Sequence, residues 1–173
     1  MATVLTDTQI KVEARARLTS AGDLQSAESS LSWPRSVSYG YGAGLDQVDL
    51  TYTKTRSIVA SGVDNIDLSG TLEDILGNGV VFARVKALAI YADPANAAGH
   101  NAVVGGATAN GWVGPFGTTA HTLAVEPGGM LAFATRTAAG WAVANGASDI
   151  LRVANGGTVS TISYQIVLYG AAS

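Results

Sequence analysis

Few side chains in this sequence have the type and spacing that catalysis or metal binding requires. The two histidines, His100 and His121, lie in separate polar loops and lack the i, i+4 spacing of a helical zinc motif. Residues 64–70 (DNIDLSG) resemble a calcium loop, but Ile66 and Leu68 stand where an EF-hand needs oxygen ligands. The sequence therefore predicts no metal site.

Motifs for nucleotide and acyl-transfer chemistry are incomplete. Residues 40–45 (GYGAGL) carry leucine where the dinucleotide motif needs its third glycine, and neither Gly-Lys nor G-x-S-x-G occurs. The absence of cysteine excludes disulfides, zinc–thiolate sites and cysteine nucleophiles. A pair among the 13 acidic residues could still meet as in a glycosidase. We nevertheless expect a protein that is not an enzyme and has no cofactor.

Length and charge narrow the class of protein. The 173 residues are enough for one domain with its own core. A net charge of −3 gives no basic excess for nucleic acid, and no run of 18 apolar residues can cross a membrane as a helix. Residues 1–17 have no apolar signal region, so we expect synthesis in a bacterial cytoplasm without export.

The charged residues are distributed unevenly. Only 13% of the chain is charged, about half the usual share, and 16 of the 23 charged side chains lie in residues 1–80. Residues 81–173 are rich in Ala, Gly, Val and Thr. Two interpretations remain open: a small-residue β domain with a Thr/Ser/Asn surface, or a surface that other subunits cover.

Alternation of apolar and polar residues predicts strands. The strongest patterns cover residues 47–55, 80–91 and 159–169, and shorter runs cover residues 101–104, 122–125, 130–135 and 149–154. Four Asn-Gly pairs and Pro127-Gly128-Gly129 favour tight turns. Short, unevenly spaced strands predict an all-β fold, an antiparallel two-sheet β-sandwich with jelly-roll connections. The segment 72–76 is the one expected helical turn.

The N-terminal region has its own pattern and is expected to form an arm. Apolar residues from Ile10 to Leu18 alternate with charged ones, which predicts a strand with one apolar face. Residues 19–44, rich in Ser and Gly, are predicted to be an extended connection, either a surface loop or an arm that docks on a neighbouring subunit. We divide the chain into an N-terminal strand and extended arm (1–44) and a sandwich domain (45–173).

Exposed aromatic and apolar side chains are candidates for contacts. Trp112 and Trp141 follow glycines in predicted loops, where a tryptophan can plug the end of a sandwich, carry a sugar ring or meet another subunit. The candidate contact residues are Ile10, Val12, Leu18, Trp33, Tyr39, Tyr41, Trp112 and Trp141.

The order of segments over residues 80–173 resembles a known family. These segments are FARVKAL (82–88), VVGGATAN (103–110) with GPF (114–116), VEPGG (125–129), GWAV (140–143), DILRVAN (149–155) and a final apolar strand. They are similar to small β-sandwich virion structural proteins of tailed bacteriophages, of the capsid decoration (cement) type. The resemblance covers about half of the chain.

The resemblance implies a function but carries over no catalytic residue. It implies a homotrimeric jelly roll on the outer surface of the capsid, with the major capsid protein as partner and no contact with nucleic acid or membrane. Many modest contacts of this kind add up by multivalency. The alternative is a tail, baseplate or fibre component that binds a host-surface glycan.

Overall fold

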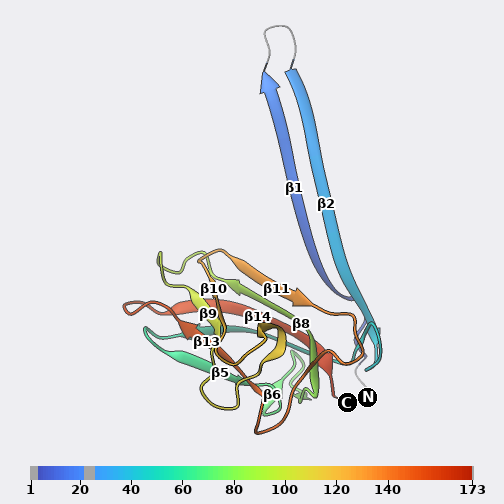
Figure 1. Ribbon diagram of the computed structural model, residues 1–173, viewed down its shortest axis with the longest axis vertical. Helices are drawn as coiled ribbons and strands as arrows, with labels where there is room; N and C mark the ends of the chain where they lie inside the picture. Colours follow the sequence, from blue (N-terminus) through green and yellow to red (C-terminus); the bar gives the residue numbers. More distant parts are fainter. Residues whose placement is uncertain (1–3, 22–25, 173) are drawn as a thin grey trace.

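The computed structural model describes residues 4–21 and 26–172, and most of them belong to β-strands. The one helical element among these residues is a single 3₁₀ turn. Figure 1 shows two parts: a body of packed sheets and a two-stranded hairpin that projects far beyond it. The predicted all-β class is confirmed.

Two antiparallel sheets form the body. We call one the front sheet; in spatial order it contains β11 (Met130–Ala134), β8 (Arg84–Ala92), β14 (Ile162–Ala171) and β4 (Leu50–Ile58), with β12 (Trp141–Ala142) also paired to β8. The back sheet contains β10 (Thr122–Val125), β9 (Ala102–Gly105), β13 (Ile150–Asn155) and β5 (Val63–Asp67). Every neighbouring pair in both sheets is antiparallel.

The connections between these strands are those of a jelly roll. Leaving out the short β12, the chain visits the front sheet with β4, the back sheet with β5, the front with β8 and the back with β9 and β10. It then returns to the front with β11, the back with β13 and the front with β14. Eight strands in this order form two interlocking Greek keys, so the jelly-roll expectation is confirmed.

The core lies between the two sheets. Alternate residues of β14 point inward, and Ile162, Tyr164 and Ile166 are fully buried there. The back sheet meets them with Leu151 and Val153. Burial of these side chains contributes about 1.5–3 kcal/mol each, and no described residue before Leu50 belongs to this core.

Short elements complete the body. β3 (Gln47–Val48) runs parallel to the end of β2, β6 (Leu72–Glu73) pairs with β7 (Gly79–Val80), and η1 (Gly114–Phe116) is a single 3₁₀ turn. The helical turn predicted at residues 72–76 is wrong. The carboxylate of Asp74 accepts hydrogen bonds from the backbone N–H groups of Leu76 and Asn78, and this stabilises a polar turn instead of a helix.

The projecting hairpin, which we call the arm, consists of β1 (Thr8–Ala21) and β2 (Ser26–Tyr41). The strand expected over residues 10–18 is confirmed, but the extended connection over residues 19–44 is wrong, because most of it is a 16-residue strand. At about 3.4 Å per residue, β1 is about 45 Å long. The arm therefore reaches well outside the body (Figure 1).

Candidate interaction surface

The two faces of the arm differ in chemistry because of its strand register. Pairing joins Ile10 to Val37, Ala14 to Trp33 and Ala16 to Leu31, so these residues share one face. We call this the apolar face of the arm; its members are Ile10, Val12, Ala14, Ala16, Leu18, Ser29, Leu31, Trp33, Arg35 and Val37. Its single charge, the guanidinium of Arg35, lies 4.7 Å from the ring centre of Trp33, as in a cation–π pair.

The opposite face of the arm is charged, and its charged side chains form ion pairs with one another. Glu13 accepts a hydrogen bond of 2.6 Å from Arg15, and Glu28 accepts one of 2.6 Å from Arg17. Lys11 lies 3.7 Å from Glu13. These exposed ion pairs add little to stability but keep this face in water. The arm thus presents one face that suits solvent and one that does not.

Exposure of the apolar face increases with distance from the body. Ile10 and Val37, at the base, are partly buried. Further out, Val12 is 40% exposed, Leu31 58% and Leu18 74%. A two-stranded hairpin has no second layer to cover such side chains. Within residues 4–21 and 26–172, nothing covers the distal apolar face, which has the chemistry of an interaction surface.

The base of the arm is anchored to the front sheet. Tyr39, Val48 and Ala87 form a small buried cluster, against which Ile10 and Val37 of the arm and Tyr169 of β14 pack. The hydroxyl of Tyr39 donates to the carbonyl oxygens of Lys86 (3.1 Å) and Thr135 (3.0 Å). Burial raises the pKa of Tyr39 to about 12, so this donor is retained at all physiological pH values.

A buried lysine fixes the loop that joins arm and body. Lys86 is fully buried, and its ammonium donates to the carbonyl oxygens of Ala43 (3.0 Å), Gly44 (2.5 Å) and Gln47 (2.7 Å). Burial, with the nearby charge of Arg84, lowers the pKa of Lys86. Three carbonyl acceptors satisfy all three of its protons, which makes burial of the ammonium tolerable.

We expect the substitution Lys86→Met to weaken this junction. Methionine fills similar space but leaves the carbonyl groups of Ala43 and Gln47 without that donor, at a cost of about 2 kcal/mol. The melting temperature should fall by about 4–8 °C, and residues 42–47 should become a preferred site of limited proteolysis. Lys54→Met, at an exposed position of the same sheet, is the matched control and should change neither. Equal shifts in both variants would contradict this role.

The candidate contact residues divide into two groups in the structure. Ile10, Val12, Leu18 and Trp33 lie on the apolar face of the arm, and Tyr41 is exposed at its end. Tyr39, in contrast, is an internal anchor, and Trp112 is buried in the body. Neither Tyr39 nor Trp112 presents its ring at the surface of the chain.

The two body tryptophans belong to one aromatic cluster. Trp112, Phe116, Phe133 and Trp141 meet edge to face, with ring centres 6.1–6.5 Å apart. The indole N–H of Trp112 donates to the carbonyl oxygen of Ala142 at 3.0 Å. This arrangement corresponds to the plug alternative, because the rings pack on each other and leave no open face of Trp112 for a sugar.

Sequence reasoning missed the contribution of β2 to the apolar face. Leu31, Trp33 and Val37 alternate with Ser32 and other serines, which is the signal that finds a half-buried strand. The serine content and Pro34 concealed it, since both are typical of loops. Proline is tolerated here because β2 is paired on one side only along the arm.

The residues that the sequence analysis considered as metal ligands make hydrogen bonds within the fold. A ring nitrogen of His121 lies 2.7 Å from the carbonyl oxygen of Phe116, and one of His100 lies 3.4 Å from that of Ser160. Asp64, in the calcium-like segment, accepts hydrogen bonds from Arg56 and Tyr164. Within residues 4–21 and 26–172, no three His, Asp or Glu side chains are grouped so as to hold a metal ion.

Comparisons of the sequence and the structure with known proteins found no match. No protein-family model matches this chain, and neither a curated protein nor a solved structure is significantly similar to it. Among the residues described by the structure, no helix has the length and hydropathy needed to cross a membrane.

Proposed function

We propose that this chain is a structural protein of a bacteriophage particle, a capsid decoration protein that binds the outer face of the major capsid protein lattice. The observation that carries the proposal is the arm, whose distal apolar face is exposed in the part of the chain that the structure describes. A surface of this kind needs a partner, since apolar area left in water costs about 25 cal/mol per Å².

The arrangement of the molecule suits a building block better than an enzyme. The body is a closed jelly roll, and the sequence has the segment order of the virion proteins that it resembles. An arm of about 45 Å allows one subunit to contact a neighbour while its body stays in place. Repetition over a lattice then turns modest contacts into a stable coat.

The copy number of the chain in purified particles tests the proposal. Quantitative mass spectrometry should give hundreds of copies per particle, comparable to the major capsid protein, and a cryo-electron microscopy map should place the jelly roll on the outside of the head. A few to tens of copies at the tail would overturn decoration in favour of a tail, baseplate or fibre component. Absence from particles would overturn a virion role altogether.

A further inference from the structure

The outer face of the front sheet carries no charge. Strand register arranges the outward side chains in rows that run across β11, β8, β14 and β4. The first row is Ala134, Ala87, Tyr169 and Thr51; the second is Ala132, Ala89, Val167 and Thr53; the third is Met130, Tyr91, Gln165 and Thr55. An uncharged face of this size is unusual on a sheet that meets only water.

The arm of the same chain covers one end of this face and leaves the rest open. Ile10 and Val37 pack near Ala134, Ala87 and Tyr169 of the first row. Ala132 of the second row lies beside the arm, whereas the remaining exposed side chains of the second and third rows are Thr53, Thr55, Tyr91, Gln165 and Met130, the last of them 61% exposed. A hollow of about 290 Å³, lined by Ile10, Val12 and Val37 of the arm and by Ala132, Phe133 and Ala134 of β11, joins the two surfaces. The apolar face of the arm is thus continuous with the outer face of the front sheet.

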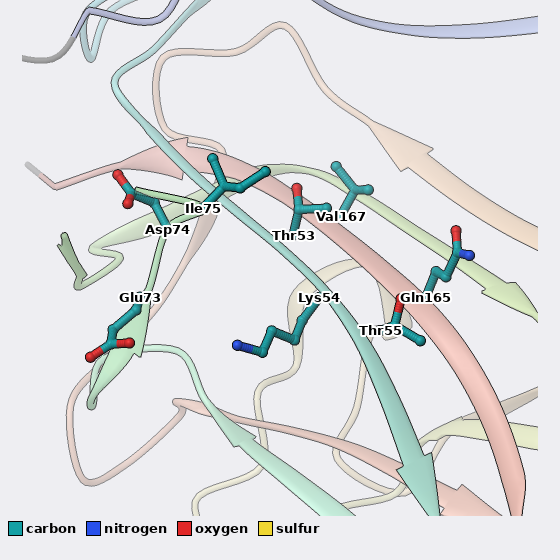
Figure 2. Close-up of a pocket in the computed structure, with 8 residues that line it drawn as sticks. All are labelled: Thr53, Lys54, Thr55, Glu73, Asp74, Ile75, Gln165 and Val167. Carbon is teal, nitrogen blue, oxygen red and sulfur yellow. The ribbon is translucent and has the colours of Figure 1, made fainter. Parts of the chain in front are cut away.

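A loop with apolar and acidic side chains borders the open rows. Figure 2 shows Glu73, Asp74 and Ile75 beside the β4 and β14 side chains of the second and third rows, around a hollow of about 380 Å³ that Lys54 of β4 also lines. Ile75 is 85% exposed although it is among the most apolar residue types. Hydrogen bonds from the side chain and backbone of Asn78 hold the pKa of Asp74 below its usual value, so its charge persists.

The arm and the body carry net charges of opposite sign. Residues 8–41 carry four basic and three acidic side chains, whereas residues 42–173 carry six basic and nine acidic ones. The one charge on the apolar face of the arm is basic, at Arg35, and Glu73 and Asp74 beside the open rows are acidic, so these charges attract each other when the arm of one copy reaches the sheet of another. Arg35, on the apolar face itself, would meet its own counterpart if arms packed together around an axis.

We propose that the distal apolar face of the arm lies across the second and third rows of the front sheet of a second copy of this chain. Within one chain, Ile10 and Val37 at the base of the arm already pack against the front sheet. The proposed contact is of the same kind, but it joins the arm of one copy to the front sheet of another. From Ala14 to Ala21 the arm extends about 25 Å, enough to cross four strands spaced about 4.8 Å apart. The proposal deepens the proposed function, because it identifies the subunit contact that would build the decorating unit.

The contact joins two different surfaces, so its geometry favours a ring. Each copy has one arm to give and one open sheet face to accept it. A head-to-tail contact of this type closes when rotation brings the last copy back to the first. A ring leaves no arm uncovered, and a three-membered ring corresponds to the homotrimer that the resemblance to virion proteins implies.

Single cysteines test the contact, because the chain contains no native cysteine. Ala16→Cys marks the apolar face of the arm, and Thr53→Cys marks the second row of the front sheet. When the two purified variants are mixed and treated with a short bis-maleimide linker, a covalent dimer of the two should form. The matched control is Ala16→Cys with Asn65→Cys, on a strand of the back sheet, which should yield at least tenfold less dimer.

A second measurement uses charge and needs no linker. In sedimentation velocity at tens of micromolar, the wild type should be an oligomer, and Leu31→Glu should shift most of it to the 17.5 kDa monomer. Thr53→Glu, on the proposed receiving face, should do the same. Ser32→Glu, at the neighbouring position on the charged face of the arm, should keep the oligomer. Circular dichroism should show that all of these variants remain folded.

Three outcomes would overturn the contact. A wild type that is monomeric, Ala16→Cys that links mainly to itself, or equal yields with Thr53→Cys and Asn65→Cys each excludes it. If the arm instead binds the major capsid protein, the free chain is monomeric while particles still carry hundreds of copies. That result would reject this inference and leave the proposed function standing.

Discussion

An arm-shortened variant should fold and melt like the full chain but lose its place in the assembly. In this variant Asn-Gly replaces residues 13–34 and joins Val12 to Arg35, which are partners in the hairpin. The main core uses no residue of the arm, and the cluster of Tyr39, Val48 and Ala87 at its base is kept. The melting temperature should therefore change by no more than a few degrees.

The loss in assembly should be much larger than the loss in stability. Removal of the distal apolar face should weaken association with particles or with other copies at least tenfold, which corresponds to about 1.4 kcal/mol or more. The full-length control Arg15→Ser changes only the charged face and should bind as the wild type does. Binding is measured as occupancy of particles and as the dissociation constant in solution.

Two results would contradict this view of the arm. If the shortened chain does not fold, the arm belongs to the folding unit of the body. If it folds and still occupies particles fully, the arm is only a tether. The experiment thus tests the division of the chain at residue 44, which assumes that the arm acts in assembly and the body folds without it.

The body could be predicted from sequence because its strands are half-buried. In β10 and β11 the bounds match the predicted runs almost residue by residue, and β14 follows the alternation of Ile162, Tyr164 and Ile166. Uneven strand spacing then favoured a jelly roll over a propeller. Long-range pairing did not need to be known, since each strand carried its own periodic signal.

Elements without that signal were missed. β5 has one buried apolar residue, Ile66, among Asp and Asn side chains, so its sequence is typical of a loop. The position of β5 is determined by its pairing with β13 and by the ion pair between Asp64 and Arg56. These are tertiary contacts, and no local pattern contains them.

The interaction surface was only half predictable for a related reason. The apolar parity of β1 showed that a face must be buried, but the pairing with β2 that doubles this face is non-local. Two aromatic residues were wrongly predicted to lie at the surface. Trp112 and Tyr39 are surface candidates by type, whereas the structure buries both and gives each polar group an acceptor.

We expect a large loss of stability in the body from Asp64→Asn. Asp64 accepts hydrogen bonds from Arg56 (2.7 Å) and Tyr164 (2.8 Å), and Arg56 also donates to Tyr52 (2.7 Å). The network ties β5 of the back sheet to β4 and β14 of the front sheet. The substitution leaves the guanidinium of Arg56, only 29% exposed, without its anion. The cost should be about 2–3 kcal/mol, a fall in melting temperature of about 5–10 °C.

The loss should depend on pH in a defined direction. Burial alone would raise the pKa of Asp64, but the hydrogen bonds from Arg56 and Tyr164 and the charge of Arg56 outweigh it and leave the pKa below its usual value. A carboxyl with a lowered pKa stabilises the fold above its unfolded pKa of about 3.9, and this stability disappears as pH falls through the folded pKa. The difference between wild type and variant should therefore be constant near neutral pH and shrink below about pH 4.

A second arginine–aspartate pair provides the matched control. Arg136 donates to Asp46 through Nε (2.6 Å) and Nη2 (2.7 Å), nearly the geometry of the Arg56–Asp64 pair, but the Arg136 side chain is 71% exposed. Asp46 has a positive φ of 53°, which asparagine tolerates, so Asp46→Asn removes the charge without backbone strain. Water replaces the lost partner there, and we expect little change in melting temperature. Equal losses in the two variants would show that pairing geometry, and not burial, sets the contribution of these ion pairs.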